Sequence, residues 1–474
     1  MSREQEEFIN YFDGSAVLHA PVGTGKTLAL ALHAAAAIEQ GMEPERILCV
    51  TFTNRAALEL RQRVALKCGA AAKKIVVRTF HSLCAWMLRS EAKRIGLPRE
   101  FTIYDEDDSI EAIGECAKKL GIQLISYKYE NEVRDVYHLI ADAKTGASVL
   151  KTGEVPEEVF AELTPTYRRL ACAYQKELAS RHGLDFADLI YFARAMLEDR
   201  EIRKRWENRF SLIQVDEMQD THLNEYQLLR VLARGVEQMV LVGDLDQTIY
   251  EWRGSEPENV LKHFRKDFPH SRSFSFTTNY RTTQKLLEAA DSVVGQYSTK
   301  TRLQPCAAAE IGEDVVCHFA PDATMEAQWI AQQIRSLKKA DESFSLSRVG
   351  VLVRTNNRAA AISDVFTRMD VPHFTVEQFD FFRRQEIKDA IAYLRFLLNP
   401  YDTRCLHRIL LRPSRGIGEV TLGHIEAAAD LGLSLVDFVK PTTFEDGDPF
   451  ARLLHEYETG SVVVFDTETT GLNP

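Results

Sequence analysis

The sequence lacks any long hydrophobic segment. Its longest apolar run, Leu28 to Ile38, is interrupted by His33, and a membrane helix needs roughly 20 apolar residues. The first residues, MSREQEEF, are charged and contain no apolar stretch of the kind that a secretory signal carries. We therefore expect a cytoplasmic protein that does not associate with a membrane.

The sequence contains few cysteines, and it has fewer basic residues than acidic ones. The eight cysteines are scattered, without a Cys-x-x-Cys pair or a nearby set of histidines, which is typical of reduced thiols rather than of a disulfide framework or a zinc site. Lys and Arg number 58 against 69 Asp and Glu, so the net charge is −11. Bulk charge thus gives no sign of a nucleic-acid partner, and any such site must be local.

Short apolar strands and helical segments alternate at the start of the chain, a pattern typical of a parallel sheet with helices on both faces. The expected strands are Ala16–His19, Ile47–Thr51, Ile75–Thr79, Leu212–Val215, Met239–Val242 and Ser273–Phe276. Between the third and fourth of them the pattern is almost wholly helical, as in Thr166–Arg181 and Asp188–Arg203. We therefore predict an α/β domain that carries a helical insertion.

A second run of strands and helices starts near residue 282. Its clearest strand is Val349–Arg354, and helices are expected over Asn357–Met369 and Glu386–Leu398. The later segment Pro441–Pro449 is acidic and contains Pro and Gly, so it is interpreted as a linker. The apolar segment Ser461–Phe465 after it is interpreted as one more strand.

A glycine-rich segment, APVGTGKT, follows the first strand and opens a helix. In this context backbone N–H groups cradle phosphates at the positive end of the helix dipole. Lys26 would reach the β- and γ-phosphates of a nucleotide, and the Thr27 hydroxyl would bind Mg²⁺. The alternative is a glycine-rich turn without a ligand. The predicted phosphate-loop residues are Ala20, Gly23, Thr24, Gly25, Lys26 and Thr27.

Two carboxylates, Asp216 and Glu217, end the apolar strand LIQV. Acidic residues at the carboxyl end of a parallel strand lie beside the phosphate loop, where open α/β sheets bind ligands. Asp216 suits Mg²⁺, and Glu217 suits activation of an attacking water. Alone, such a pair is more often a solvated turn, but the phosphate loop favours the catalytic interpretation.

Several further motifs occur in the order found in one family. They are TFTNRAA at 51–57, TFHS at 79–82, DFAD at 185–188, DEMQDT at 216–221, VGDLDQTIYEWRG at 242–254 and NYRT at 279–282. Together they resemble the UvrD/Rep/PcrA-like superfamily 1 DNA helicases, and the resemblance extends to about residue 430. It implies an ATP-driven motor that moves 3′ to 5′ on single-stranded DNA and unwinds duplex or junction DNA, in repair or recombination.

The resemblance also implies roles within the nucleotide site. Gln5 would read the adenine of ATP and Tyr280 would stack on it. Arg281 would place its charge on the γ-phosphate, and Gln247 would sense that phosphate. The predicted catalytic residues are Lys26, Asp216, Glu217, Gln247 and Arg281, and the expected cofactors are ATP and Mg²⁺.

The same motifs offer aromatic rings and polar groups to a DNA strand. Sequence-tolerant binding of single strands depends on bases stacked on aromatic faces and on donors to phosphates. The predicted DNA-contact residues are Phe52, Thr53, Asn54, Thr79, His81, Tyr250, Trp252 and Arg253. The alternative is that Phe52 and Trp252 are core aromatics.

The end of the sequence resembles a different family. The segment VVVFDTETTGLNP is similar to the first motif of DnaQ-like (DEDD) 3′–5′ exonucleases. Asp466 and Glu468 lie two residues apart on an expected strand and so face one side, where they would bind a metal pair. The remaining exonuclease acids are not found, nor are helicase motifs V and VI. The sequence therefore predicts a truncated piece of a longer helicase–nuclease.

These observations predict one architecture and leave two alternatives for its function. We expect a RecA-like domain 1A (1–89 and 207–279), a helical domain 1B (90–206), a partial RecA-like domain 2A (280–375), a helical 2B fragment (376–445) and the first strand of an exonuclease domain (460–474). One alternative to a helicase is a fragment that binds ATP and DNA with little turnover. The other is a protein that is chiefly a nuclease, with the motor supplying its DNA.

Overall fold

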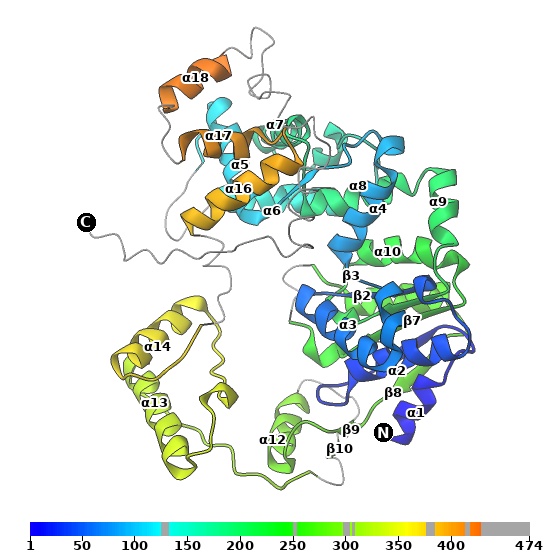
Figure 1. Ribbon diagram of the computed structural model, residues 1–474, viewed down its shortest axis with the longest axis vertical. Helices are drawn as coiled ribbons and strands as arrows, with labels where there is room; N and C mark the ends of the chain where they lie inside the picture. The colour runs from blue at the N-terminus through cyan, green and yellow to red at the C-terminus, as the bar shows by residue number, and fades with distance from the viewer. Residues whose placement is uncertain are drawn as a thin grey trace, which may run out of the picture. The chain divides into compact units, whose positions relative to one another are not determined.

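The structure, a computed structural model, describes residues 1–124, 132–249, 254–296, 304–305, 309–375, 384–412 and 418–427. Two compact units are present: one contains residues 1–312 and 395–474, and the other residues 313–394. Figure 1 shows their helices and strands.

The strands are β1 Ala16–His19, β2 Ile47–Thr51, β3 Val76–Thr79, β4 Thr102–Tyr104, β5 Gly183–Asp185, β6 Leu212–Val215, β7 Gln238–Gly243, β8 Arg272–Ser275, β9 Thr278–Asn279 and β10 Gln304–Pro305. The α-helices of the first half are α1 Arg3–Ile9, α2 Lys26–Glu39, α3 Asn54–Cys68, α4 Phe80–Ile95, α5 Glu106–Lys119, α6 Glu132–Thr145, α7 Pro165–Ser180, α8 Phe186–Met196, α9 Arg200–Glu207 and α10 Leu223–Leu232. The later ones are α11 Pro257–Asp267, α12 Gln284–Val294, α13 Ala323–Ala340, α14 Asn356–Arg368, α16 Gln385–Leu398, α17 Thr403–Leu411 and α18 Glu419–Ala427.

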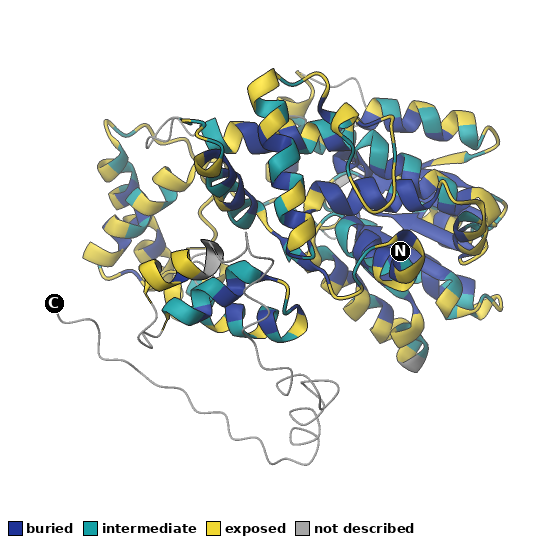
Figure 2. Cartoon of the chain, turned by 90° about the horizontal axis from the view of Figure 1, so that it is seen from above, coloured by how far each residue is buried: buried dark blue, intermediate teal, exposed yellow. Residues whose placement is uncertain are grey.

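A six-stranded parallel sheet organises the first unit, with strand order β3-β2-β6-β7-β1-β8. Successive residues of a strand face opposite sides, so on β1 Val17 joins one apolar core while Ala16 and Leu18 join the other. Helices α1, α2 and α3 contribute to the second core, and α4, α8, α10 and α11 to the first. Figure 2 shows the buried sheet residues between these helices. All six strands expected from the sequence are confirmed.

The insertion between β3 and β6 is mainly helical and has a core of its own from α5, α6 and α7. It also contains a short parallel pair, β4 and β5, which the sequence pattern did not reveal. The single helix expected over Asp188–Arg203 is wrong. The chain forms α8 and α9 there, because the Asp199 side chain accepts hydrogen bonds from the Glu201 and Ile202 backbone N–H groups and starts a new helix.

A fully buried ion group stabilises this insertion. The Lys144 ammonium on α6 lies 2.6 Å from an Asp185 carboxylate oxygen and 2.8 Å from one of Asp188, both in the DFAD segment. The Tyr174 hydroxyl on α7 donates to Asp185 at 3.0 Å. Burial alone would raise the pKa of Asp185, but Lys144 lowers it, whereas burial and the neighbouring Asp185 charge raise the pKa of Asp188. The carboxylates of this motif are therefore structural.

We predict that Lys144→Met lowers the free energy of unfolding by about 3 kcal/mol or more, because it leaves buried carboxylates without their cation. Denaturant unfolding followed by circular dichroism measures this. The matched control is Lys119→Met, which breaks an exposed pair with Glu177 and should cost under about 1 kcal/mol. Equal losses in the two variants would contradict the structural role of Lys144.

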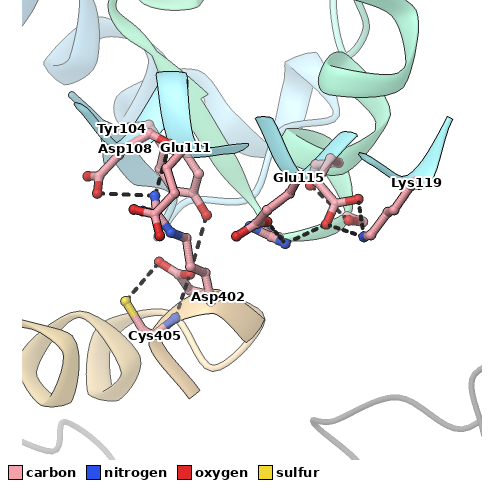
Figure 3. Close-up of polar contacts among 11 residues, drawn as sticks. Tyr104, Asp108, Glu111, Glu115, Lys119, Asp402 and Cys405 are labelled. Atoms are coloured by element: carbon pink, nitrogen blue, oxygen red, sulfur yellow. Dashed lines mark hydrogen bonds and ion pairs between the residues drawn. The ribbon is translucent and has the colours of Figure 1, made fainter. Parts of the chain in front are cut away.

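Residues in and just after helices α16 and α17 form hydrogen bonds with the helical insertion. The Asn399 side-chain amide, just after α16, donates to the Thr102 hydroxyl and to the Arg181 carbonyl. Figure 3 shows the adjoining polar contacts, in which the Tyr104 hydroxyl donates to Asp402 at 3.3 Å. These contacts connect segments almost 300 residues apart in the sequence.

The second unit is built on the pair α13 and α14, which share a small apolar core. The helices expected over Asn357–Met369 and Glu386–Leu398 are confirmed as α14 and α16. The strand expected over Val349–Arg354 is wrong: these residues form no strand, and Leu352 is 93% exposed. A strand requires a hydrogen-bonded neighbour, and residues 309–375 provide none. The expected linker Pro441–Pro449 and strand Ser461–Phe465 lie outside the described residues.

No helix among the described residues combines the length and the hydrophobicity that a membrane span requires.

A buried histidine lies on α2, the helix that follows the phosphate loop. The His33 ring on α2 stacks on Phe8 and Phe12 at centroid distances of 5.1 and 4.7 Å. Its Nε2 lies 3.1 Å from the Tyr11 carbonyl, and its Nδ1 lies 2.8 Å from the Gln214 amide nitrogen. This network fits a neutral ring that is protonated on Nε2. Burial lowers the pKa of His33 to about 4.

His33 should make the protein less stable in acid. The unfolded chain takes up this proton near pH 6.5 and the folded chain only near pH 4, so stability is lost as the pH falls between these values. Between pH 7.5 and 5 we expect His33 to account for a loss of about 2 kcal/mol. Denaturant unfolding of the wild type and of His33→Gln at both pH values measures this. An identical pH dependence in the two proteins would contradict it.

Candidate nucleotide-binding site

The loop between β1 and α2 has the backbone geometry that its glycines permit. Gly23 and Gly25 adopt φ values of 77° and 85°, in the left-handed region that favours glycine. The Thr24 hydroxyl donates to the Pro21 carbonyl at 2.7 Å, and the Gln5 amide donates to the Thr24 carbonyl at 2.9 Å. The predicted adenine-reading residue thus lies against the loop. Ala20, the first loop residue, is buried, and Thr27 is half-buried in the first turn of α2.

The predicted catalytic lysine and glutamate are in contact. Lys26 Nζ lies 2.6 Å from Glu217 Oε2, although 191 residues separate them in the sequence. Glu217 has a φ of 54°, a conformation that is costly for a residue other than glycine and that occurs at functional sites. The two side chains that the sequence analysis assigned to phosphate binding and water activation therefore form an ion pair with each other.

Asp216 is suited to a divalent cation. Its carboxylate is buried and accepts the Glu217 backbone N–H at 3.0 Å. Burial, and next the neighbouring Glu217 charge, raise the pKa of Asp216, so a cation at this position would stabilise the ionised form. Among the described residues, no group of three or more His, Cys, Asp or Glu side chains could hold a metal ion. Mg²⁺ is commonly bound by one or two protein groups together with substrate phosphates.

A glutamine of the DEMQDT motif, to which the sequence analysis assigned no role, connects this site to the next motif. The buried Gln219 donates to Glu217 Oε2 at 2.8 Å and accepts the Asp244 backbone N–H at 3.0 Å. Asp244 in turn accepts the Gln247 side-chain amide at 2.6 Å. A continuous chain of hydrogen bonds therefore joins Lys26 to the predicted phosphate sensor. The signal in the sequence was the place of Gln219 in the DEMQDT motif.

The NYRT segment lies directly over the phosphate loop. The Asn279 amide donates to the Val22 carbonyl at 2.9 Å, and the Tyr280 N–H donates to the Gly23 carbonyl at 2.9 Å. A Cβ on Gly23 would lie 2.4 Å from Asn279 Nδ2 and 3.0 Å from Arg281 Cβ. The predicted base-stacking residue Tyr280 and the predicted arginine finger Arg281 are both exposed beside the loop.

The predicted DNA-contact residues of the first two motifs lie at the carboxyl ends of β2 and β3. Phe52 is half-buried, so it is not a core aromatic, and Thr53 and Asn54 are exposed. Thr79 is the N-cap of α4, where its hydroxyl accepts the Ser82 N–H. Tyr250, Trp252 and Arg253 lie outside the described residues.

His81 has an aromatic neighbour that the sequence motifs did not indicate. Its ring packs edge-on against Phe186, with centroids 5.1 Å apart, and burial lowers the pKa of His81 to about 4. Phe186 is 38% exposed. The DFAD motif therefore combines buried acids with one exposed ring beside a predicted DNA-contact residue.

Comparison with known proteins identifies the family. Residues 1–269 match the UvrD/REP helicase N-terminal domain, and residues 274–466 match the UvrD-like helicase C-terminal domain. The chain belongs to the UvrD/Rep helicase family. It is 31% identical over 451 residues to the ATP-dependent DNA helicase PcrA of Staphylococcus epidermidis, covering 94% of this chain and 60% of that protein. PcrA of Staphylococcus aureus is 31% identical over 428 residues, 90% of this chain and 57% of that protein.

The match to the C-terminal domain corrects two expectations. It extends over residues 274–466, so the family resemblance does not stop near residue 430 and a separate exonuclease domain is not supported. The chain spans about 60% of the length of the PcrA relatives, yet both UvrD-type domains are recognised in it. The expectation of a truncated second domain is therefore not supported. Asp466 and Glu468, the proposed exonuclease ligands, lie outside the described residues.

Gln219 connects Glu217 to Asp244 through two hydrogen bonds, which we call the Gln219 bridge. The close packing at Gly243 allows this bridge to be tested by substitution. A Cβ at this position would lie 2.5 Å from Gln219 Oε1 and 2.6 Å from Met218 Cγ. Gly243→Ala should therefore displace Gln219 and lower the free energy of unfolding by about 1–3 kcal/mol. Gly114→Ala is the control: nothing lies within 4 Å of its Cβ, and in the interior of α5 it should stabilise by about 0.5–1 kcal/mol. An unchanged unfolding midpoint for Gly243→Ala would show that Gln219 is not packed tightly against this glycine.

Proposed function

We propose that this chain is the ATP-hydrolysing motor of a 3′–5′ DNA helicase that moves on single-stranded DNA and unwinds duplex or junction DNA, in repair or recombination. The observation that carries the proposal is the hydrogen-bonded chain from Lys26 through Glu217 and Gln219 to the Asp244–Gln247 pair. Membership of the UvrD/Rep family and similarity to ATP-dependent DNA helicases support it.

The geometry suggests how ATP would activate the site. Lys26 neutralises Glu217 at a distance of 2.6 Å. Phosphates bound over Gly23–Thr27 would compete for Lys26 and so release Glu217 to accept a proton from the attacking water. Mg²⁺, when bound by Thr27 and Asp216, would offset the charge of the phosphates. Arg281, exposed beside the loop, would add a positive charge near the γ-phosphate.

The same hydrogen bonds would transmit a structural change on ATP hydrolysis to the predicted DNA-contact segment. Glu217 and Gln247 are joined through Gln219 and Asp244, so movement of Glu217 or of the γ-phosphate would shift the segment that begins at Asp244. The predicted base-stacking residue Trp252 follows Gln247 closely in that segment. Phosphate release would therefore change the stacking of Trp252 on a DNA base. A motor that moves along a strand requires such a change in its DNA contacts in each ATPase cycle.

A second candidate function is binding of ATP and DNA without appreciable turnover. The unpaired segment Val349–Arg354 favours it, because a RecA-like second domain would need that strand in a sheet in order to position charges against the nucleotide. Binding of ATP without hydrolysis in the presence of single-stranded DNA would establish this second function in place of the first.

We predict that Glu217→Gln binds ATP at least as tightly as the wild type but hydrolyses it roughly 10²–10⁴-fold more slowly, because the general base is lost while the phosphate contacts remain. Lys26→Ala should instead weaken ATP binding itself. Calorimetry with ATP and Mg²⁺, beside steady-state hydrolysis with saturating single-stranded DNA, separates the two effects.

The matched control is Glu154→Gln in the helical insertion, whose exposed carboxylate pairs with Lys151. It should leave both binding and hydrolysis unchanged. Wild-type rates in Glu217→Gln would show that Glu217 is not the base and would overturn the assignment of the site.

A further inference from the structure

A group of arginines surrounds one tryptophan at the edge of the sheet. β3 is one of the two edge strands of the sheet, and its residue Arg78 places its guanidinium 4.9 Å from the centroid of the Trp86 ring on α4. Arg209, which follows α9, lies 4.5 Å from the same ring and 5.1 Å from the Trp206 ring. The two indoles meet edge to face at 5.2 Å. Both guanidiniums thus pack against the Trp86 ring.

Two more arginines add to this positive charge. Burial lowers the pKa of Arg78, and the nearby charges of Arg61 and Arg89 lower it further. Arg61 donates to the Val77 carbonyl, and Arg89 donates to the Phe101 carbonyl and lies over the Phe101 ring. In the described part of the chain, none of the cluster Arg61, Arg78, Arg89 and Arg209 forms an ion pair with a carboxylate.

This arrangement is unlike that of the neighbouring charges. Arg205 on α9 pairs with Glu91 at 2.7 Å, and Glu91 also accepts the Trp206 indole N–H. The protein has a net charge of −11, so acidic residues are abundant, yet Arg78 is repelled by the nearby charges of Arg61 and Arg89. Such local repulsion raises the free energy of the protein until an anion approaches. Guanidinium groups match phosphate oxygens in shape and in hydrogen-bonding geometry.

We propose that the cluster Arg61, Arg78, Arg89 and Arg209 binds the phosphate backbone of DNA and extends the strand path over the β3 edge of the sheet. Arg78 immediately precedes Thr79, a predicted DNA-contact residue at the start of α4, so a strand that reaches Thr79 is adjacent to the cluster. The proposal rests on the proposed function, since it assumes that DNA occupies that path. An acidic protein segment is the competing partner.

The test compares the salt dependence of DNA binding. Fluorescence anisotropy with a labelled oligothymidine of about 20 nucleotides, long enough to cover one or more single-strand sites, gives the slope of log K against log salt concentration. Each phosphate contact contributes about 0.7 to this slope for single strands. The double variant Arg78→Ala/Arg209→Ala should therefore lower the slope by about 1.4 and weaken binding most at low salt.

Two controls separate charge from packing. Arg78→Lys/Arg209→Lys keeps the charge and should retain a slope near that of the wild type, whereas a fall as large as in the alanine variant would show that only the ring packing matters and would overturn the proposal. Arg3→Ala removes an exposed arginine on α1 and should change nothing. Thermal unfolding of each variant establishes that it is folded.

Two results would reject the proposal. An unchanged slope and affinity in the folded alanine variant would mean that DNA does not reach the cluster, leaving an acidic protein segment as the partner. Failure of the wild type to bind the oligonucleotide at all would instead reject the proposed function, and the inference with it.

Discussion

The site depends on one constraint: parallel strands end at the same edge of a sheet. β1 lies between β7 and β8, and β6 lies beside β7. The loop after β1, the acids after β6 and the Asp244 turn after β7 therefore meet, although they come from residues near 20, 216 and 244. The ion pair between Lys26 and Glu217 results from this geometry. So does the Gln219 bridge, because its two partners follow adjacent strands.

Buried charge is used in two different ways in the first unit. In the helical insertion, Lys144 is surrounded by Asp185, Asp188 and Tyr174, and its charge is compensated within the protein. At the candidate nucleotide site, Asp216 is buried and Lys26 pairs with Glu217, so the charge of Asp216 is incompletely compensated. Removing one member of an internally compensated group leaves a buried charge unpaired, whereas charge that is not fully compensated is available to a ligand.

The same distinction applies to aromatic side chains. His33 lies between Phe8 and Phe12 and is a neutral member of the core. Trp86, by contrast, is half-buried beneath two guanidiniums that have no carboxylate partner in the described ranges. Residue type alone does not separate these two cases, because both are rings beside polar groups. The difference is whether the polar groups around the ring have hydrogen-bond or ion-pair partners within the protein.

The sequence by itself determined the local features of this protein. The six strands of the sheet and the phosphate loop follow from hydrophobic pattern and glycine placement, which act over a few residues. The break between α8 and α9 also has a local cause, the N-cap residue Asp199. The helical periodicity continues across this residue, so the sequence pattern predicted one helix. Val349–Arg354 shows the limit of such patterns: an apolar run becomes a strand only when another segment pairs with it.

Only the tertiary structure decided which distant residues meet. The contacts of Lys26 with Glu217, of Gly23 with Asn279 and of Asn399 with Thr102 join residues about 190 to 300 positions apart. Resemblance to a family suggested members for the candidate nucleotide site but assigned no role to Gln219 and no burial to the acids of the DFAD motif. Hydrogen bonding and burial depend on the environment that the whole fold creates, and no single segment contains that information.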